Sequence, residues 1–452
     1  FIMSETIGLI GIGVMGSNIA LNFSDKNIPV HVFNRSEKKI NSLMGRDSSG
    51  NITGSTDIKK FINNLPKPRK ILMLIPSGKP TLDMAKELMG YLEPNDILID
   101  GGNAYYLDSN KLGKMCEEKG IEFIGMGVSG GEEGARKGPA LMVGSSKSIN
   151  EDLKNSLSLI SASFNDKPSI GFYKGHGTGH FIKMLHNGIE YAEMQIITEA
   201  FHMLKKANFD HEQISNFFRD FSKENRSSYL IEITSEIMLK KNESGYLIDQ
   251  IKSEASHKGT GKLTVETSLN YGFPLPSIYE AFNARVESNF QNWWSEKIEG
   301  EEIHIDTGFL SNAIYFARLA TMAQGLLFVE HVSSTDNLEI NLNEVLQNWS
   351  AGCIIRSDLL KELKDANLSN TITSSKFVQN ALMENIDDVK KVIKTCIDSG
   401  VSIPVITSSY NWFVGTSSSF NPSSLIQAQR DYFGSHQVQL NNSDEFIHLD
   451  WD

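Results

Sequence analysis

Short apolar runs alternate with stretches of helical period through the first part of the chain, residues 1–177. Apolar runs of this length, bounded by turn residues, are typical of buried strands. We expect such strands at residues 7–10, 29–33, 70–75, 96–100, 121–128, 139–144 and 169–173. Repeated strand–helix units predict an α/β domain with a doubly wound, mostly parallel sheet, which binds ligands at the carboxyl ends of its strands.

After Gly175–Gly179 the apolar positions recur with the period of a helix. The expected helices are at residues 179–207, 212–222, 228–240, 262–271, 276–297, 310–331, 342–348, 353–366 and 386–399, with loops at 301–310 and 367–376. No alternating strand pattern follows, so we predict an all-helical domain at residues 178–434. The tail, residues 435–452, is too polar to form a core by itself. It is either loose or docked on another surface, such as a second subunit.

A glycine-rich turn joins the first expected strand to the first expected helix. Gly11, Gly13 and Gly16 stand in the order G-x-G-x-x-G, with Val14 and Met15 between the last two. The first glycine permits a tight turn, the second lets main chain approach a pyrophosphate, and the third lets helix pack close on strand. We therefore predict dinucleotide binding by a Rossmann-type domain. The alternative is an ordinary glycine-rich turn.

The end of the second expected strand indicates which dinucleotide is bound. An NAD-specific site places an acidic residue there to bind the ribose 2′-hydroxyl. This chain instead has Asn34, Arg35 and Ser36. Because an arginine can stack on adenine and pair with a 2′-phosphate, the segment favours NADP. The alternative is that Arg35 is a solvated charge at a strand end.

Other loops at the strand ends carry glycine beside polar residues. They are Ile75–Gly78, Asp100–Asn103 and Val128–Gly138. Glycine lets the main chain approach a ligand closely, while Asn103 and Ser129 can form hydrogen bonds with it. We expect ligand contacts in these loops, although turn chemistry alone could account for them.

The stretch from Thr178 to Leu204 predicts a long apolar helix that carries a polar face. Lys183, His186, Asn187 and Glu190 are three or four residues apart, so they share one face within two turns. Charged groups on an apolar helix cost free energy unless they are paired with an opposite charge or serve the protein's function. The stretch alone leaves two readings open: a structural ion pair or polar stripe, and a catalytic face.

Composition narrows the class of protein. The formal net charge of −12 argues against a general binder of nucleic acid or anionic membranes. No apolar run is long enough to predict a membrane span. Cys116, Cys353 and Cys396 are far apart and lack metal-ligand spacing, so we expect a reduced, cytoplasmic compartment and no metal site.

Three cationic groups occur in the second part of the chain. They are the segment His257–Lys262, with two lysines and two glycines, the side chain of Arg285, and the segment Ile426–His436. Read alone, each is better explained as surface charge or a contact between helices. Together they could gather around a small anion.

The sequence resembles the 6-phosphogluconate dehydrogenase family. The resemblance rests on ordered segments that span nearly the whole chain: G-L-I-G-I-G-V-M-G, F-N-R-S, I-D-G-G-N, G-V-S-G-G-E-E-G-A-R-K-G-P, G-H-F-I-K-M-L-H-N-G-I-E-Y, H-K-G-T-G-K, G-C-I-I-R-S and L-I-Q-A-Q-R-D-Y-F-G-S-H. It implies oxidation and decarboxylation of 6-phosphogluconate to ribulose 5-phosphate with NADP and without metal. It also implies a homodimer in which the tail of each subunit penetrates the other.

The resemblance also assigns site residues. It makes Lys183 the general base and Glu190 the general acid. It implies substrate contacts by Asn103, Ser129, Gly130, Gly131, His186, Asn187, Tyr191, Lys258, Thr260 and Arg285, and by Arg430 and His436 of the other subunit. The implied cofactor contacts are Gly11, Gly13, Val14, Met15, Gly16, Asn34, Arg35, Ser36, Ile75, Ser77 and Asn103.

The chain departs from the family pattern at three places. Gly13 stands where many members have alanine, which should be harmless. Pro76 stands where a basic residue is common, so the family's basic contact to the cofactor is not expected there. The chain after His436 is short compared with many members.

Two other functions share part of this pattern. Another β-hydroxyacid dehydrogenase, such as one acting on 3-hydroxyisobutyrate, would share the glycine turn and Lys183 but lack counterparts of His257–Lys262 and Gln427–His436. A non-catalytic NADPH-binding protein would be expected to have lost Lys183, Glu190 or the cationic groups.

Overall fold

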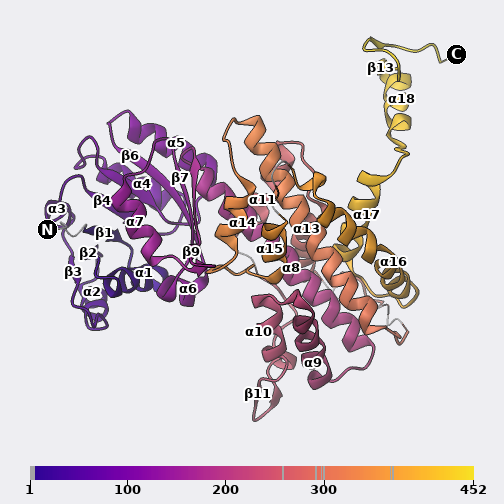
Figure 1. The fold of residues 1–452 in the computed structure, drawn as a ribbon, viewed down its shortest axis with the longest axis horizontal. Helices are drawn as coiled ribbons and strands as arrows, with labels where there is room; N and C mark the ends of the chain where they lie inside the picture. The colour runs from indigo at the N-terminus through magenta and orange to yellow at the C-terminus, as the bar shows by residue number, and fades with distance from the viewer. Residues whose placement is uncertain are drawn as a thin grey trace.

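The computed structural model describes residues 6–256, 259–290, 293–296, 298, 301–366, 368 and 371–451. A sheet domain, a helical domain and a protruding C-terminal arm follow one another along the chain (Figure 1). The predicted fold class, an α/β domain followed by a large helical domain, is confirmed.

The sheet has eight strands in the order β10-β7-β6-β5-β4-β1-β2-β3. All neighbouring pairs are parallel except β6 and β7. The strands are β1 (Ile7–Ile10), β2 (Val30–Phe33), β3 (Ile52–Ser55), β4 (Lys70–Met73), β5 (Ile97–Asp100), β6 (Glu122–Ser129), β7 (Ala140–Ser145) and β10 (Ile170–Lys174). Every expected strand is present, and β3 is an additional one.

Helices cover both faces of the sheet, as a doubly wound fold requires. They are α1 (Val14–Asp25), α2 (Glu37–Met44), α3 (Ile58–Asn63), α4 (Lys79–Leu88), α5 (Tyr106–Glu117), α6 (Gly131–Lys137) and α7 (Glu151–Ile160). One apolar core contains residues of α1, α2, α6 and α7, and the other contains residues of α3, α4 and α5. A small hairpin, β8 (Ser163–Phe164) and β9 (Lys167–Pro168), precedes β10.

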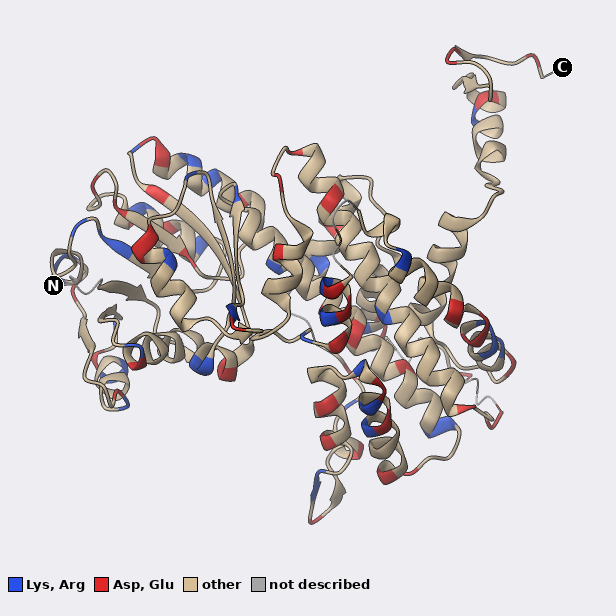
Figure 2. Cartoon of the chain, in the orientation of Figure 1, with Lys and Arg blue, Asp and Glu red and all other residues tan. Residues whose placement is uncertain are grey.

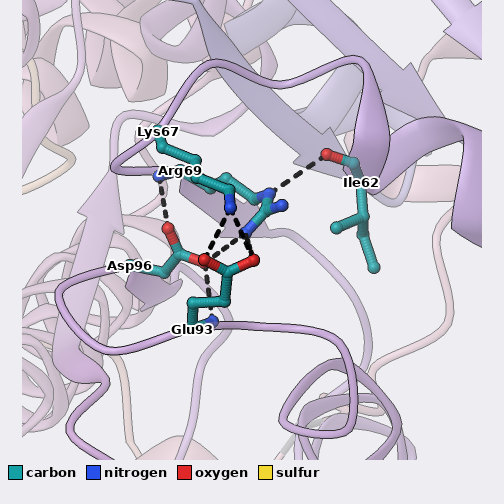
Figure 3. A network of polar contacts seen from close by, with 5 residues as sticks. All are labelled: Ile62, Lys67, Arg69, Glu93 and Asp96. Carbon is teal, nitrogen blue, oxygen red and sulfur yellow. Dashed lines mark hydrogen bonds and ion pairs between the residues drawn. The ribbon is translucent and has the colours of Figure 1, made fainter.

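A buried ion pair fastens the amino ends of two central strands (Figure 3). Arg69, just before β4, pairs with Asp96, just before β5, at 2.8 Å, and its main-chain N–H donates to the same carboxylate at 2.7 Å. The Arg69 Nε–H also donates to the Ile62 carbonyl at 3.2 Å. This end of the sheet is therefore braced by side chains, whereas the opposite, carboxyl end carries the glycine-rich loops.

The second domain is built on two 29-residue helices, α8 (Thr178–Lys206) and α13 (Thr307–Thr335). Around them lie α9 (His211–Phe221), α10 (Tyr229–Ile237), α11 (Thr260–Asn270), α12 (Pro276–Glu287), α14 (Leu342–Trp349), α15 (Asp358–Asp365), α16 (Lys376–Asp398) and α17 (Pro404–Ser417). Short helical turns occur at Ser222–Arg226, Ile248–Gln250 and Ile372–Ser374, and one hairpin joins β11 (Lys241–Asn242) to β12 (Gly245–Tyr246). No described helix combines the length and apolar character that a membrane-spanning segment requires.

Side-chain caps start several of these helices where the sequence changes from polar to apolar. Asp210 and Gln213 form a reciprocal capping box at α9, and Asp306 accepts from two N–H groups at the start of α13. Three expected bounds were wrong: α12 ends at Glu287 instead of residue 297, α15 begins at Asp358 instead of residue 353, and α16 begins at Lys376 instead of residue 386. Helix α17 and a further helix, α18 (Ser423–Gly434), were not predicted.

Among the contacts that join the domains, two place α8 and α14 against the sheet. The first half of α8 packs on β6 and β7, where a Cβ on Gly127 would lie 2.3 Å from the Lys183 Cβ. From α14, the Asn348 side-chain amide donates to the Leu141 carbonyl of β7 at 2.7 Å and to the Ser169 carbonyl at 3.0 Å. Because both contacts are buried, the sheet and the polar face of α8 are held in one fixed relation.

The C-terminal arm points away from the body of the molecule (Figure 1). It consists of α18 (Ser423–Gly434) and a hairpin of β13 (Val438–Gln439) and β14 (Phe446–Ile447). Its helix is mostly uncharged (Figure 2). The arm therefore exposes apolar side chains that the rest of this chain does not cover, among them Phe433 at 72% and Tyr432 at 67% exposure.

Candidate active site

The glycine turn between β1 and α1 has the geometry that its sequence predicts. Gly11 has φ +95°, and a Cβ there would lie 2.5 Å from the Leu74 carbonyl oxygen. A Cβ on Gly16 would lie 1.9 Å from the Gly11 carbonyl oxygen. A Cβ on Gly13 would meet nothing within 4 Å, so alanine would also fit. Two of the glycines are thus required by packing, and the third leaves main chain open to a ligand.

The segment Asn34–Ser36 follows β2, which pairs in parallel with β1. Both strands end at the same edge of the sheet, so this segment lies beside the glycine turn. The Asn34 side-chain amide donates to the Ser36 carbonyl at 3.3 Å, and Ser36 precedes α2. The Arg35 side chain is exposed at this edge and is available to an anion.

A cavity of about 580 Å³ lies between the carboxyl ends of the strands and α11. Its lining is Met15, Leu74, Ile75, Pro76, Ser77, Gly101, Gly102, Asn103, Val128, Gly259, Thr260, Lys262, Leu263 and Glu266. The predicted cofactor contacts Met15, Ile75 and Ser77 therefore meet Thr260 across one cavity. Lys262 and Glu266, which face each other at 3.1 Å, were not assigned to the site from sequence.

A narrow inner pocket continues towards α8. It is lined by Asn103, Ala104, His180, Lys183, Met184, Asn187, Thr260 and Leu263. Asn103, Thr260 and Leu263 line both spaces. A ligand in the larger cavity can therefore lie next to Lys183 and Asn187, on the face of α8 that the spacing predicts.

The polar face of α8 forms a chain of short contacts. The Lys183 Nζ lies 3.4 Å from His186 Nδ1, and the other ring nitrogen, Nε2, lies 3.2 Å from the Ser129 hydroxyl at the end of β6. The Asn187 side-chain oxygen lies 3.3 Å from His186 Nδ1, and a Glu190 carboxylate oxygen lies 3.8 Å from it. The structure thus brings these five predicted residues together around one buried imidazole.

Burial sets the protonation of this cluster. Removal from water lowers the pKa of Lys183, and the nearby Glu190 carboxylate only partly opposes that shift. Burial likewise raises the pKa of Glu190, against the pull of Lys183 and Arg285. Burial and the Lys183 charge hold the pKa of His186 well below its usual value. Burial therefore shifts all three groups towards their uncharged forms.

The loop Ser129–Gly131 is supported from behind by the helical domain. Gly130 and Gly131 have φ +116° and +62°, which glycine adopts without strain. A Cβ on Gly130 would lie 2.5 Å from the Gly352 carbonyl oxygen, which also accepts from the Ala140 N–H at 2.9 Å. Gly352 opens the G-C-I-I-R-S segment, to which sequence reasoning gave no role.

Trp349 and Cys353 were also missed from sequence. The Trp349 indole meets the His186 imidazole edge-on, with ring centroids 6.1 Å apart. The Cys353 thiol is buried near Lys183, and that burial raises the pKa of Cys353 to about 12. Trp349 packs on the imidazole of the cluster, whereas Cys353 opposes the lowering of the Lys183 pKa that burial causes. Only their place in the fold reveals this.

The residues predicted to bind a phosphate group lie partly together. The Arg285 guanidinium stacks 3.7 Å from the centre of the Tyr191 ring. A Cβ on Gly261 would lie 2.4 Å from the same ring, so the start of α11, with Thr260, packs against Tyr191. Lys258 lies outside the described residues, and its predicted contact stays a prediction.

Arg430 and His436 are not brought to this cluster within one chain. Both are exposed on the C-terminal arm (Figure 1), where the Arg430 guanidinium donates to the Gln427 side-chain oxygen at 3.1 Å. Within the described ranges, no group of three or more His, Cys, Asp or Glu side chains could hold a metal ion.

A dinucleotide-binding turn, an interdomain cavity and a buried lysine in the adjoining inner pocket are the features expected of a dehydrogenase. Comparison with known proteins identifies the family. Residues 6–171 match the NAD binding domain of 6-phosphogluconate dehydrogenase, and residues 179–451 match the C-terminal domain of 6-phosphogluconate dehydrogenase. The chain belongs to the 6-phosphogluconate dehydrogenase family.

Similar proteins span the full chain. It is 36% identical to the NADP(+)-dependent, decarboxylating 6-phosphogluconate dehydrogenase of Bacillus subtilis, covering 99% of both chains. It is also 36% identical to the decarboxylating enzyme of Caenorhabditis elegans, covering 98% of this chain and 96% of that one. Plasmodium falciparum 6-phosphogluconate dehydrogenase has a solved structure with 34% identity and a TM-score of 0.91, covering 99% of this chain and 100% of that one.

Proposed function

We propose that this chain catalyses the NADP-dependent oxidation and decarboxylation of 6-phosphogluconate to ribulose 5-phosphate, CO2 and NADPH. The observation that carries the proposal is the buried polar face of α8, Lys183 to Glu190, beneath the interdomain cavity. Full-length similarity to decarboxylating relatives supports the same activity. The two domains would meet near residue 177, where α8 begins.

The residues at the sheet edge fit NADP. The open position at Gly13 and the helix N-terminus that follows it suit a pyrophosphate, and Arg35, with Asn34 and Ser36, suits a 2′-phosphate. Bound NADP supplies a hydride acceptor. Pro76 lines the cavity without a charge, so Arg35 has to carry the recognition of the 2′-phosphate.

Lys183 acts first as a base. Its lowered pKa favours the neutral amine, which takes the proton of the C3 hydroxyl as the hydride leaves C3. The product is a β-keto acid, which loses CO2 because the adjacent carbonyl accepts the electron pair. The protonated Lys183 then stabilises the developing oxyanion.

Glu190 acts as the acid. Its raised pKa favours the protonated carboxyl, which donates a proton to C1 of the enediol. Ser129, His186 and Asn187 hydrogen-bond the sugar acid, and the main chain of Gly130 and Gly131, with Asn103, closes around it. A lysine and a glutamate two turns apart can address different substrate carbons.

The phosphate of the substrate would bind at Arg285, Tyr191, Thr260 and Lys258, completed by Arg430 and His436 of a second subunit. The protruding arm supports a homodimer, because its exposed aromatic side chains need a surface that this chain does not provide. Three buried, free cysteines agree with a reducing compartment, and we place the protein in the cytoplasm.

One spectrophotometric experiment separates the proposed function from its rivals. NADPH absorbance should rise when 6-phosphogluconate is added to the protein and NADP, more slowly with NAD, and not with 3-hydroxyisobutyrate. A rise with 3-hydroxyisobutyrate alone would identify another β-hydroxyacid dehydrogenase. NADPH binding without turnover of either acid would identify a non-catalytic binder.

A further inference from the structure

Asp431 is a buried charge on an otherwise exposed helix. It is 0% exposed, although Tyr432 and Phe433 beside it are largely exposed. A buried carboxylate costs free energy unless hydrogen bonds replace its water. Its surroundings on the arm must therefore supply hydrogen-bond donors.

Four donors from the tail converge on this carboxylate. The first oxygen accepts from the Gln437 N–H at 2.7 Å and lies 3.0 Å from His448 Nδ1. The second accepts from the Leu449 N–H at 3.0 Å and from the Trp451 indole N–H at 2.9 Å. The tail after α18 thus folds back on the helix around a single side chain.

The balance of these contacts keeps Asp431 ionised. Burial would raise its pKa, but the hydrogen bonds from Leu449, His448, Trp451 and Gln437 outweigh burial and hold the pKa below its usual value. A carboxylate that accepts four hydrogen bonds cannot be replaced by an amide without leaving donors unmatched.

The same contacts tie together the two residues that sequence assigns to the partner's site. Arg430 directly precedes Asp431, and His436 directly precedes Gln437, so the Asp431–Gln437 hydrogen bond joins their main chains. Gln427 adds a second tie, since its side-chain amide donates to the Gln437 carbonyl at 2.6 Å and its oxygen accepts from Arg430.

We propose that Asp431 is a positioning residue for the active site of the second subunit. It folds the tail onto α18 so that Arg430 and His436 are presented to the substrate phosphate as one rigid unit. The inference rests on the proposed function, because it requires that the arm completes the partner's site. A pre-ordered arm loses less conformational entropy on binding than a loose tail would.

The direct variant is Asp431→Asn. We expect the KM for 6-phosphogluconate to rise about tenfold, because a less ordered arm binds the phosphate more weakly. The KM for NADP should stay within about twofold of the wild-type value, since Gly11–Gly16 and Arg35 belong to the same subunit. Hydrogen exchange over residues 435–451 should speed up. The matched control is Asp444→Asn, an exposed acid in the same tail, which should change none of these quantities.

Mixed dimers test whether Asp431 acts across the interface. In the first dimer, one subunit carries Lys183→Met and the other carries Asp431→Asn, so the only live site receives an intact arm. In the second, one subunit carries both substitutions and the other is wild type, so the only live site receives the altered arm. We expect a wild-type KM in the first dimer and about a tenfold higher KM in the second.

Each other outcome has a definite meaning. Equal KM values in the two mixed dimers, or an unchanged tail in hydrogen exchange, would overturn the role of Asp431. Arg430→Ala placed in the same dimers separates this from the proposed function. If Arg430→Ala raises the KM across the interface and Asp431→Asn does not, the second subunit does complete the site, but Asp431 does not position its arm. If neither does, both fall together, and a Lys183→Met homodimer that still turns over would remove the catalytic proposal independently.

Discussion

Two buried, titratable side chains of α8, Lys183 and Glu193, lie in different surroundings. Glu193 lies 2.6 Å from the Arg318 Nε of α13, with side chains 3% and 0% exposed. Lys183 lies 3.4 Å from the neutral imidazole of His186 and forms no ion pair among the described residues. Glu193 is therefore paired within the protein, whereas Lys183 lines the narrow inner pocket.

The contrast shows that an ionic partner, more than burial, distinguishes a charged group that stabilises the fold from one that takes part in a reaction. Arg318 also donates to the Arg226 carbonyl at 3.0 Å, although its Nη2 is buried without a hydrogen-bond partner among the described residues. Lys183 has no carboxylate partner of this kind in the part of the chain that the structure describes. A buried charge without an ionic partner is expensive to keep and is therefore expected at a site that uses it. Substitutions of the paired and the unpaired groups test this distinction.

The largest effect is expected at Lys183. Lys183→Met should lower kcat about 10⁴-fold, because the general base and the charge at the oxyanion are lost together. NADP binding and the melting temperature should not fall, since the substitution replaces a buried amine that has no ionic partner among the described residues. Steady-state kinetics, NADP titration and a thermal melt measure the three quantities. Near-normal turnover would remove Lys183 from the mechanism.

The paired charges should respond in the opposite way. Arg318→Met leaves Glu193 buried and unpaired, which should lower the free energy of unfolding by about 3–5 kcal/mol. The KM of the molecules that remain folded should not change. Urea unfolding measures the loss, and Glu193→Leu combined with Arg318→Met should restore much of it. An undisturbed unfolding curve for Arg318→Met would contradict the structural role.

Glu199, further along α8, is expected to link pH to stability. Its carboxylate accepts from the Val405 and Ile406 N–H groups at the start of α17, at 2.8 and 3.0 Å. Burial raises the pKa of Glu199 from 4.5 to about 7. The folded state therefore holds a proton that the unfolded state has released, and this contribution, present below pH 4.5, is lost as the pH rises to about 7.

The expected size is at most about 3 kcal/mol. Unfolding free energies of the wild type and of Glu199→Gln, measured from pH 4.5 to 8, give the difference that isolates this group. Parallel curves across that window would show that Glu199 does not titrate there.

The smallest of these effects is expected at Glu190. Glu190→Gln should lower kcat about 10²-fold, because the enediol must then take its proton from water. A raised pKa keeps the wild-type carboxyl protonated to higher pH, so the rate should fall once the pH exceeds that pKa. The variant should lose this alkaline limb of the pH–rate profile. Its persistence would assign the limb to another group.

Local signals made much of the fold predictable. The apolar strands, the glycine turn and the polar face of α8 are each indicated by a short local pattern of residues. Strand β3 was missed because I-T-G-S contains too little apolar sequence to stand out. Helix α17 was missed because β-branched and hydroxyl residues are poor helix formers. Its first N–H groups are satisfied by Glu199, a residue 206 positions earlier.

Long-range packing explains what sequence could not supply at the site. Glu193 and Arg318 are 125 residues apart, and either could as well have been a surface charge. Gly352 supports Gly130 from another domain, and Trp349 reaches His186 from α14. These partners have no common motif, because each is defined only by the contact that the fold creates.

The edge of the sheet has a consequence for synthesis of the chain. Strand β10 is an edge strand, and its Phe172 N–H is satisfied by the Glu344 carboxylate of α14, 172 residues later. While the ribosome is still making the helices in between, that edge is open to pairing with other nascent chains. We therefore expect residues 1–177, produced alone, to aggregate more readily than the full chain. In the full chain, α14 is synthesised after β10 and then covers the open edge of that strand.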